Sequence, residues 1–138
     1  MSLVRKVFVD SDVIISSLIS TSGAAHFLLS QNFNTNYYVS DLSLKELKIV
    51  IKRMEIPEID FQKLTESVLK LIKIGKVDNK FQDYVTDLND AHIVAGAAKA
   101  NASFLISYNQ KHFRVEKIKQ DFDIILMTPA QFLQYLRQ

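Results

Sequence analysis

The sequence predicts an α/β fold in which a doubly wound parallel sheet lies between two layers of helices. Short β-branched and aromatic runs, too brief for helices, recur along the chain. They alternate with segments of helical periodicity, as in βαβ units. The first run ends in two carboxylates, and open α/β sheets place their ligands at the carboxyl ends of the strands. These three observations predict the architecture and the edge at which a site should lie.

The composition is ordinary for a globular chain. With 138 residues, 48% of them hydrophobic and 23% charged, residues 1–138 suit a single domain. There is no cysteine, which excludes disulfides and thiolate zinc sites and leads us to expect a cytoplasmic protein. No apolar run approaches the roughly 20 residues of a membrane span, so we expect no membrane partner. A net charge of +2 is too small to indicate a nucleic-acid binder by itself.

The first predicted strand, 7–9, runs directly into Asp10 and Asp12. A short helix should follow from about Val13, and a second helical piece should cover 24–31. Capping of the first helix by Ser11 or Asp12 is an alternative role for this segment. Capping by either residue would still leave Asp10 unexplained at a half-buried position, where a lone carboxylate is costly.

The second predicted strand, 37–39, leads into a helix over 42–53 with an apolar stripe along one face. Glu46 lies early in this helix. It has two interpretations at this point: a capping box with Ser43, in which it would reach back to a free N–H, or a functional carboxylate. Local pattern does not decide between them.

Helical spacing continues over 61–73, with Asp60 as the expected N-cap and Gly75 as the residue that ends the helix. The next segment, 76–84, is polar and poorly patterned, with room for a short strand.

The last third of the chain repeats the alternation. An alanine-rich helix is expected over 91–100, and buried strands over 104–106 and 124–127. Thr128 and Pro129 then form an N-cap and N1 pair for the closing helix.

Carboxyl and amide side chains from distant segments should meet at one edge of this sheet, because every strand-to-helix turn opens there. They are Asp10, Asp12, Glu46, Asp90 and Asn109. A cluster of this sign repels itself unless a cation lies among it. Oxygen ligands without cysteine or a histidine pair favour Mg²⁺ or Mn²⁺ over Zn²⁺. Such an ion can lower the pKa of bound water and offset charge on a phosphoryl group.

Five segments, in this order and spacing, resemble the PIN-domain family, and within it the ribonuclease toxins of toxin–antitoxin pairs. They are VFVDSDVIIS at 7–16, YYVS with KEL at 37–47, DLNDAHIVAGA at 87–97, FLISYNQKHF at 104–113 and MTPAQFL at 127–133. The resemblance spans residues 7–136 and implies a PIN-like three-layer α/β/α fold. It further implies a Mg²⁺ or Mn²⁺ site that hydrolyses phosphodiester bonds in RNA.

The resemblance assigns the family's first three acids to Asp10, Glu46 and Asp90, as metal ligands. The fourth acid falls on Asn109, where this sequence departs from the family's usual Asp. It departs again at Asp12, where the family more often has Asn. Our hypothesis is that Asp12 restores the charge missing at Asn109; neutral drift at a tolerant position is the alternative.

Further roles follow from the same resemblance. Asp12 and Asn109 would complete or orient the metal shell, and Ser107 would hydrogen-bond a carboxylate or the substrate phosphate. Asp87 is a helix-entry acid that belongs either to the site or to a cap. No histidine receives a catalytic role.

Basic residues flank the expected site on two sides and would bind RNA phosphates; Lys111 is the one assigned to the substrate. A solvated helix face is the alternative for each of them. The two groups are Lys45, Lys48, Lys52 and Arg53, and Lys111, Arg114, Lys117 and Lys119.

Through the resemblance, a small antitoxin protein and a second copy of the chain become candidate partners, besides RNA. Two rival functions remain open. A haloacid-dehalogenase-like phosphatase would use Asp10 as nucleophile and Asp12 as acid/base, but the chain lacks the late acidic pair that this class expects. A catalytically weakened PIN module that binds RNA or protein would explain Asn109.

Overall fold

The computed structural model describes residues 4–31 and 33–138. Its sheet has five strands in the order β3-β2-β1-β4-β5, and every neighbouring pair is parallel. This confirms the predicted α/β class. The strands are β1 (Arg5–Val9), β2 (Thr35–Ser40), β3 (Leu69–Ile72), β4 (Phe104–Ile106) and β5 (Ile125–Met127).

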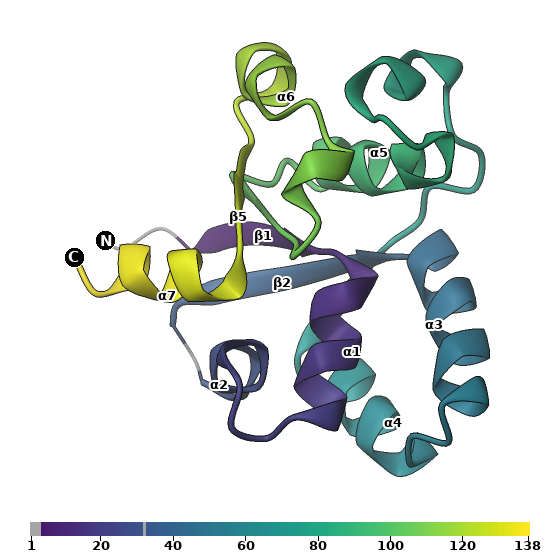
Figure 1. Cartoon of the computed structure of the whole chain (residues 1–138), viewed down its shortest axis with the longest axis vertical. Helices are drawn as coiled ribbons and strands as arrows, with labels where there is room; N and C mark the ends of the chain where they lie inside the picture. Colours follow the sequence, from purple (N-terminus) through teal and green to yellow (C-terminus); the bar gives the residue numbers. More distant parts are fainter. Residues whose placement is uncertain (1–3, 32) are drawn as a thin grey trace.

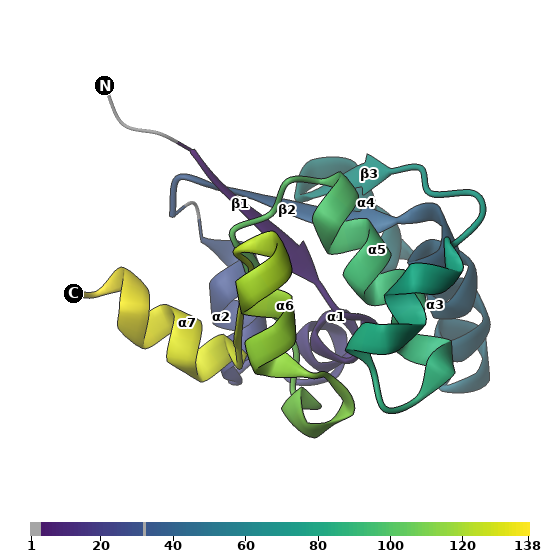
Figure 2. The same cartoon turned by 90° about the horizontal axis from the view of Figure 1, so that it is seen from above.

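Helices cover both faces of the sheet (Figure 1). One layer contains α1 (Ser11–Ile19), α2 (Ala24–Ser30), α3 (Asp41–Arg53), α4 (Glu58–Ser67) and α7 (Pro129–Leu136). The other contains α5 (Ala91–Lys99) and α6 (Val115–Phe122), which Figure 2 shows from above in front of the sheet. Three 3₁₀ turns, η1 (Asn79–Tyr84), η2 (Leu88–Asp90) and η3 (Gln110–His112), lie with the second layer.

The central strand shows why two layers form. Val7 and Val9 are fully buried in the core beneath α1 and α3, whereas Phe8 between them is fully buried in the core beneath α5. Successive strand side chains point to opposite faces, so a strand that is apolar throughout needs cover on both sides. Gly96 lets α5 come close, because a Cβ there would lie 2.5 Å from the Phe8 ring.

The prediction of one helix over 61–73 is wrong. Helix α4 ends at Ser67, and the residues after Val68 form β3, which pairs with β2 at the sheet edge. A short apolar run fits a helix face and a strand equally well, so periodicity alone did not separate them. The helix also begins earlier than expected, at Glu58 after Pro57, which leaves Asp60 in the first turn instead of at the cap.

Two further segments differ from expectation. Residues 79–84 form the 3₁₀ turn η1 where a short strand was the alternative, and Gly75, with φ of +69°, lies in the loop after β3 and ends no helix. Helix α6 was not expected at all, although Val115, Ile118 and Phe122 follow a helical spacing. Thr128 caps α7 in a capping box with Gln131, as the Thr-Pro pair predicted.

Within the described ranges, no single helix has the length and hydropathy to cross a membrane. The pair α1 and α2 meets that criterion only jointly and is bent by 94° at its break. Both helices bury apolar side chains in the core.

Candidate functional site

Asp10 lies at the carboxyl end of β1, where the register with β4 brings it beside Ser107. Val9 pairs with Ile106, and the Asp10 N–H donates to the Ile106 carbonyl at 3.0 Å. One carboxylate oxygen of Asp10 accepts from the Ser11 N–H at 2.7 Å, and the other accepts from Ser107 Oγ at 2.8 Å. Asp10 is therefore itself the N-cap of α1, so the alternative in which Ser11 or Asp12 caps this helix is wrong.

Asp12 and Asn109, which the sequence analysis linked through their charge, are in direct contact. Asp12 Oδ2 accepts from Asn109 Nδ2 and from the Tyr108 N–H, both at 3.1 Å. The Asn109 N–H donates to Ser107 Oγ at 3.0 Å, so the turn after β4 holds both aspartates at once. The amide of Asn109 thus serves Asp12 as a donor. That Asp12 replaces a missing charge stays a prediction.

The aspartates at this edge have raised pKa values. Burial, followed by the charge of Asp12, raises the pKa of Asp10 to about 7 against the opposing hydrogen bond from Ser107. Burial also raises the pKa of Asp12 and of Asp90. Asp90 contributes repulsion to both of the other aspartates, which places its charge in the same neighbourhood. The three charges therefore repel one another, and the arrangement is unfavourable when all three carboxylates are ionised.

Asp90 sits where η2 passes into α5. Its Oδ2 lies 3.3 Å from Nδ1 of His112, a residue of η3. Asp87 caps η2 by accepting from the Asn89 N–H at 3.0 Å, which supports the capping role of the two considered for it.

Glu46 is held differently, and the capping box with Ser43, one of its two interpretations, does not form. The N-cap of α3 is Ser40, whose Oγ accepts from the Ser43 N–H at 3.0 Å. Glu46 Oε1 instead lies 3.1 Å from His92 Nε2 on α5. The Glu46 side chain is 55% exposed and that of His92 only 11%, so a mostly buried imidazole holds a mostly exposed carboxylate.

Sequence reasoning assigned no role to the two histidines that contact candidate acids. His92 follows Asp90 by two residues, yet nothing in the local pattern connects it with Glu46 on another helix. His112 lies in a turn that was not expected. His26, by contrast, contacts the backbone carbonyl of Ser17 at 3.0 Å and none of these acids.

Comparison with known proteins adds an independent finding. A sequence model described as the PIN domain matches residues 6–111. The chain belongs to the PIN-domain family. The matched region includes Asp10, Glu46, Asp90 and Asn109, and PIN domains are generally nucleases.

A solved structure supports the same fold. The PIN chain is similar to a chain in the crystal structure of VapBC2 from Rickettsia felis bound to a DNA fragment from their promoter. The TM-score is 0.60 at 18% identity, and the alignment covers 90% of this chain and 98% of that chain. A search among curated proteins gives no match.

PIN nucleases generally use divalent metals, so the fit of such an ion to this PIN domain can be tested on its side chains. Among the described residues, no three Asp, Glu, His or Cys side chains lie together as a ready metal shell. However, Asp12 Oδ1 and Asp90 Oδ2 are buried and accept no hydrogen bond from the described residues. His112 Nδ1 lies 3.3 Å from Asp90 Oδ2.

Mg²⁺ keeps several waters and commonly binds through only one or two carboxylates. Asp12 and Asp90, each with a buried oxygen that accepts no hydrogen bond, therefore fit a partly hydrated hard cation. The convergence of Asp10, Glu46 and Asp90 on one ion stays a prediction.

Proposed function

We propose that this PIN domain is a Mg²⁺- or Mn²⁺-dependent endoribonuclease. The observation that carries the proposal is the set of contacts at the carboxyl edge of the sheet that joins Asp10 to Asp12 through Ser107 and Asn109. Asp90 lies near enough for its charge to raise the pKa of both aspartates. A bound divalent cation would relieve that repulsion, and carboxylates are the ligands that hard cations prefer. Membership of the PIN family adds the expectation of nuclease chemistry, and it gives no support to the phosphatase alternative.

In this proposal Asp10, Glu46 and Asp90 hold the metal, directly or through water. The ion would supply a polarised water and offset charge on the phosphate oxygens. Hydrolysis requires a water oxygen to attack phosphorus in line, while the opposite P–O bond breaks and its oxygen takes up a proton.

The neighbouring side chains keep the acids in place. Ser107 orients Asp10 by donating to Oδ2, and Asn109 orients Asp12 through its amide. His92 keeps Glu46 directed towards α5, the helix that Asp90 introduces. Fixed ligands lower the cost of reorganisation when metal and substrate bind.

We further propose that the nuclease is the toxin of a toxin–antitoxin pair, acting in the cytoplasm, with a small antitoxin and a second copy of the chain as partners. The support is the sequence resemblance and the fold shared with VapBC2. Expression alone should arrest growth of the host, and co-expression of the proposed antitoxin should relieve the arrest. Growth arrest that persists in Asp10→Asn would contradict a nuclease toxin.

The nuclease is tested with pooled cellular RNA incubated with the purified chain in Mn²⁺, Mg²⁺ or EDTA. We expect cleavage that needs a divalent ion and falls at least about a hundredfold in Asp10→Asn and in Asp90→Asn, since each removes a charge from the metal shell. Asp60→Asn, an exposed acid on α4, is the matched control and should retain activity.

One observation favours a second candidate, a PIN module that binds RNA without cutting it. The side chain of Asn109 is an amide that donates to Asp12, so the position of the family's fourth acid supplies no carboxylate. RNA binding by the wild type without metal-dependent cleavage would establish this module and overturn the nuclease. Cleavage that survives in both Asp10→Asn and Asp90→Asn would point to a contaminant. Hydrolysis of a chromogenic phosphomonoester would instead support the phosphatase alternative.

A further inference from the structure

Tyr108 differs from the other tyrosines in its surroundings. Tyr37 and Tyr38 pack in the two cores, and Tyr84 and Tyr135 pack against phenylalanine rings. Tyr108 belongs to neither core, and among the described residues no other aromatic ring packs against it. It is 44% exposed, in the turn after β4 that also carries Ser107 and Asn109. Core packing therefore does not account for this ring.

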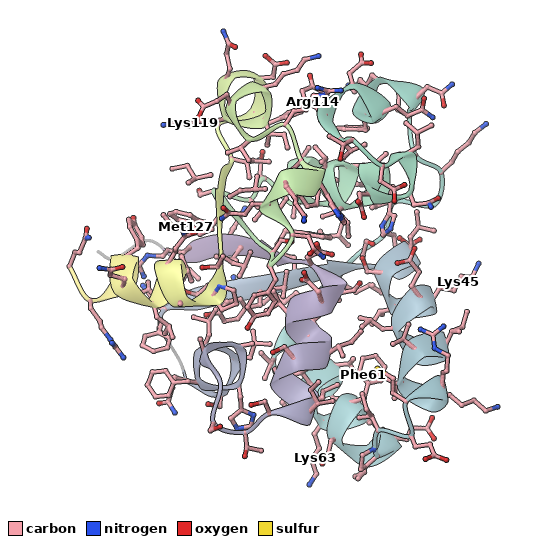
Figure 3. The ribbon with its side chains drawn as sticks, viewed as in Figure 1. Lys45, Phe61, Lys63, Arg114, Lys119 and Met127 are labelled. Carbon is pink, nitrogen blue, oxygen red and sulfur yellow. The ribbon has the colours of Figure 1, made fainter. Side chains whose placement is uncertain are left out.

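The backbone that carries Tyr108 is held at three consecutive residues. The Ser107 N–H donates at 3.0 Å to the carbonyl of Met127, which Figure 3 shows on β5. The Tyr108 N–H donates to Asp12 Oδ2 at 3.1 Å, and the Asn109 N–H donates to Ser107 Oγ at 3.0 Å. The ring is therefore attached to the same backbone that positions the acids of the candidate site.

The side chain of Tyr108 extends along α1. Its hydroxyl oxygen lies 3.4 Å from Oγ of Ser16 on that helix. The candidate cations Lys111 and Arg114 belong to the other layer: Lys111 lies in η3 and Arg114 precedes α6, where Figure 3 shows it. The ring and these cations thus lie on different sides of the acids, so a ligand at the acids could contact the ring independently of the cations.

An exposed, fixed aromatic ring is a suitable surface for a nucleobase. Every base has a flat π face, so stacking tolerates any sequence, and its loss weakens binding by roughly fivefold to a hundredfold for each base. Single strands of RNA present their bases unpaired, so the faces are free to stack on aromatic side chains. A ring that is already held in place loses little conformational entropy when it binds.

We infer that Tyr108 stacks on a nucleobase of single-stranded RNA next to the bond that is cut. The inference rests on the proposed ribonuclease and adds a contact to a base, which is separate from any contact to phosphate. In the alternative, the ring only covers part of α1 through its contact with Ser16. The two interpretations differ in whether the effect of removing the ring depends on the presence of bases in the ligand.

The test measures binding in EDTA, without cleavage, by fluorescence anisotropy of two labelled chains of equal length. One is a single-stranded RNA, and the other is its abasic counterpart, which keeps the sugars and phosphates. Tyr108→Ala should bind the RNA at least about fivefold more weakly than the wild type does, and the abasic chain within about twofold. Tyr108→Phe keeps the ring and should bind both chains within about twofold of the wild type.

Phe27→Ala is the matched control, because Phe27 is 43% exposed on α2 and its removal deletes a ring of similar exposure. It should bind both chains as the wild type does. Tyr108→Trp gives a direct signal, since the sequence contains no tryptophan. Its fluorescence should be quenched by the RNA and not by the abasic chain. This readout also decides the question if Tyr108→Ala unfolds at a lower temperature than the wild type.

Equal losses of Tyr108→Ala on the RNA and on the abasic chain would overturn the inference, because the ring would then act only by supporting the turn. So would unchanged RNA binding by Tyr108→Ala, an equal loss in Phe27→Ala, or no quenching in Tyr108→Trp. Failure of the nuclease gives a different result: RNA binding would still depend on Tyr108, but the wild type would show no metal-dependent cleavage.

Discussion

Asp10 and Glu46 have the same predicted role, but the molecule holds them in opposite ways. Asp10 is 9% exposed and receives hydrogen bonds from Ser11 and Ser107, both fixed by strand register and helix start. Glu46 is mostly exposed, and the contact that holds it is the imidazole of His92. Strand register and the start of α1 thus place the acid at the strand end together with its partner Ser107, whereas the contact of the acid on a helix depends on how α3 packs against α5.

The sharpest way to test this contrast is the stability of the metal-free protein. Asp10 has a folded-state pKa of about 7 against an ordinary value of 3.8. Between about pH 4 and pH 7 the folded protein therefore binds a proton at Asp10 more tightly than the unfolded chain does. The contribution of Asp10 to the free energy of unfolding falls as the pH rises through this window. Asp10→Asn should stabilise the metal-free protein at pH 8, on the order of a few kcal/mol.

This stabilisation should disappear near pH 4, and Mn²⁺ should reduce the difference at pH 8. Thermal unfolding at both pH values measures it. Glu46→Gln, the control at the exposed acid, should change the unfolding free energy by less than about 0.5 kcal/mol. If Asp10→Asn lowered the free energy of unfolding at pH 8, the burial of the ionised Asp10 carboxylate would not destabilise the metal-free protein.

The helix-borne acid should respond most to loss of its partner. His92→Leu fills the buried position with an apolar side chain but removes the nitrogen that contacts Glu46. We expect the Mn²⁺ affinity, measured by calorimetry, to fall about tenfold to a hundredfold, as for other residues that orient metal ligands. His92→Gln, which retains a donor, should recover most of the loss. Unchanged affinity in His92→Leu would remove Glu46 from the metal shell.

A double-mutant cycle examines the contact between Asp12 and Asn109. Asn109→Asp alone would bring two carboxylates together where an amide now donates at 3.1 Å, so it should weaken the fold and alter Mg²⁺ affinity. Asp12→Asn combined with Asn109→Asp should recover about 1.5 kcal/mol relative to the sum of the single effects. Mg²⁺ titration provides the readout, and a double variant without recovery would reject charge compensation.

The smallest effect is expected at Ser107, which is fully buried. Ser107→Ala removes the hydroxyl that donates to Asp10 and accepts from the Asn109 N–H. Stability at pH 8 should fall by about 1 kcal/mol, because a buried carboxylate loses one donor. Ser103→Ala, at an exposed position before β4, is the control for urea unfolding. Equal midpoints for the two variants would show that Ser107 does not support Asp10.

The fold was largely predictable where the pattern was unambiguous. The segments 7–9, 37–39, 104–106 and 124–127 are continuous apolar runs in the sequence, and each lies within or overlaps an observed strand. Strand β3 was not predicted, because Leu69–Ile72 is short and lies at the sheet edge, where the side chain of Leu71 is 49% exposed. Such a segment becomes a strand only when the free edge of β2 is available to pair with it.

In the candidate site, too, the residues at strand ends could be predicted from the sequence and the contacts between helices could not. Asp10, Asp12 and Asn109 follow strands, so sequence alone predicted that they would lie at one edge, and their contacts agree. The partners of Glu46 and Asp90 could not be predicted in this way. They come from His92 and His112, which reach these acids only after α3, α5 and η3 have packed.

The sequence by itself determined the layer order, the sheet edge that carries the acids and the family, because strand periodicity and strand ends are local properties of the chain. The tertiary structure decided which imidazole contacts which carboxylate. Those pairings depend on how closely helices approach, as Gly96 against Phe8 illustrates, and close packing is a property of the assembled core.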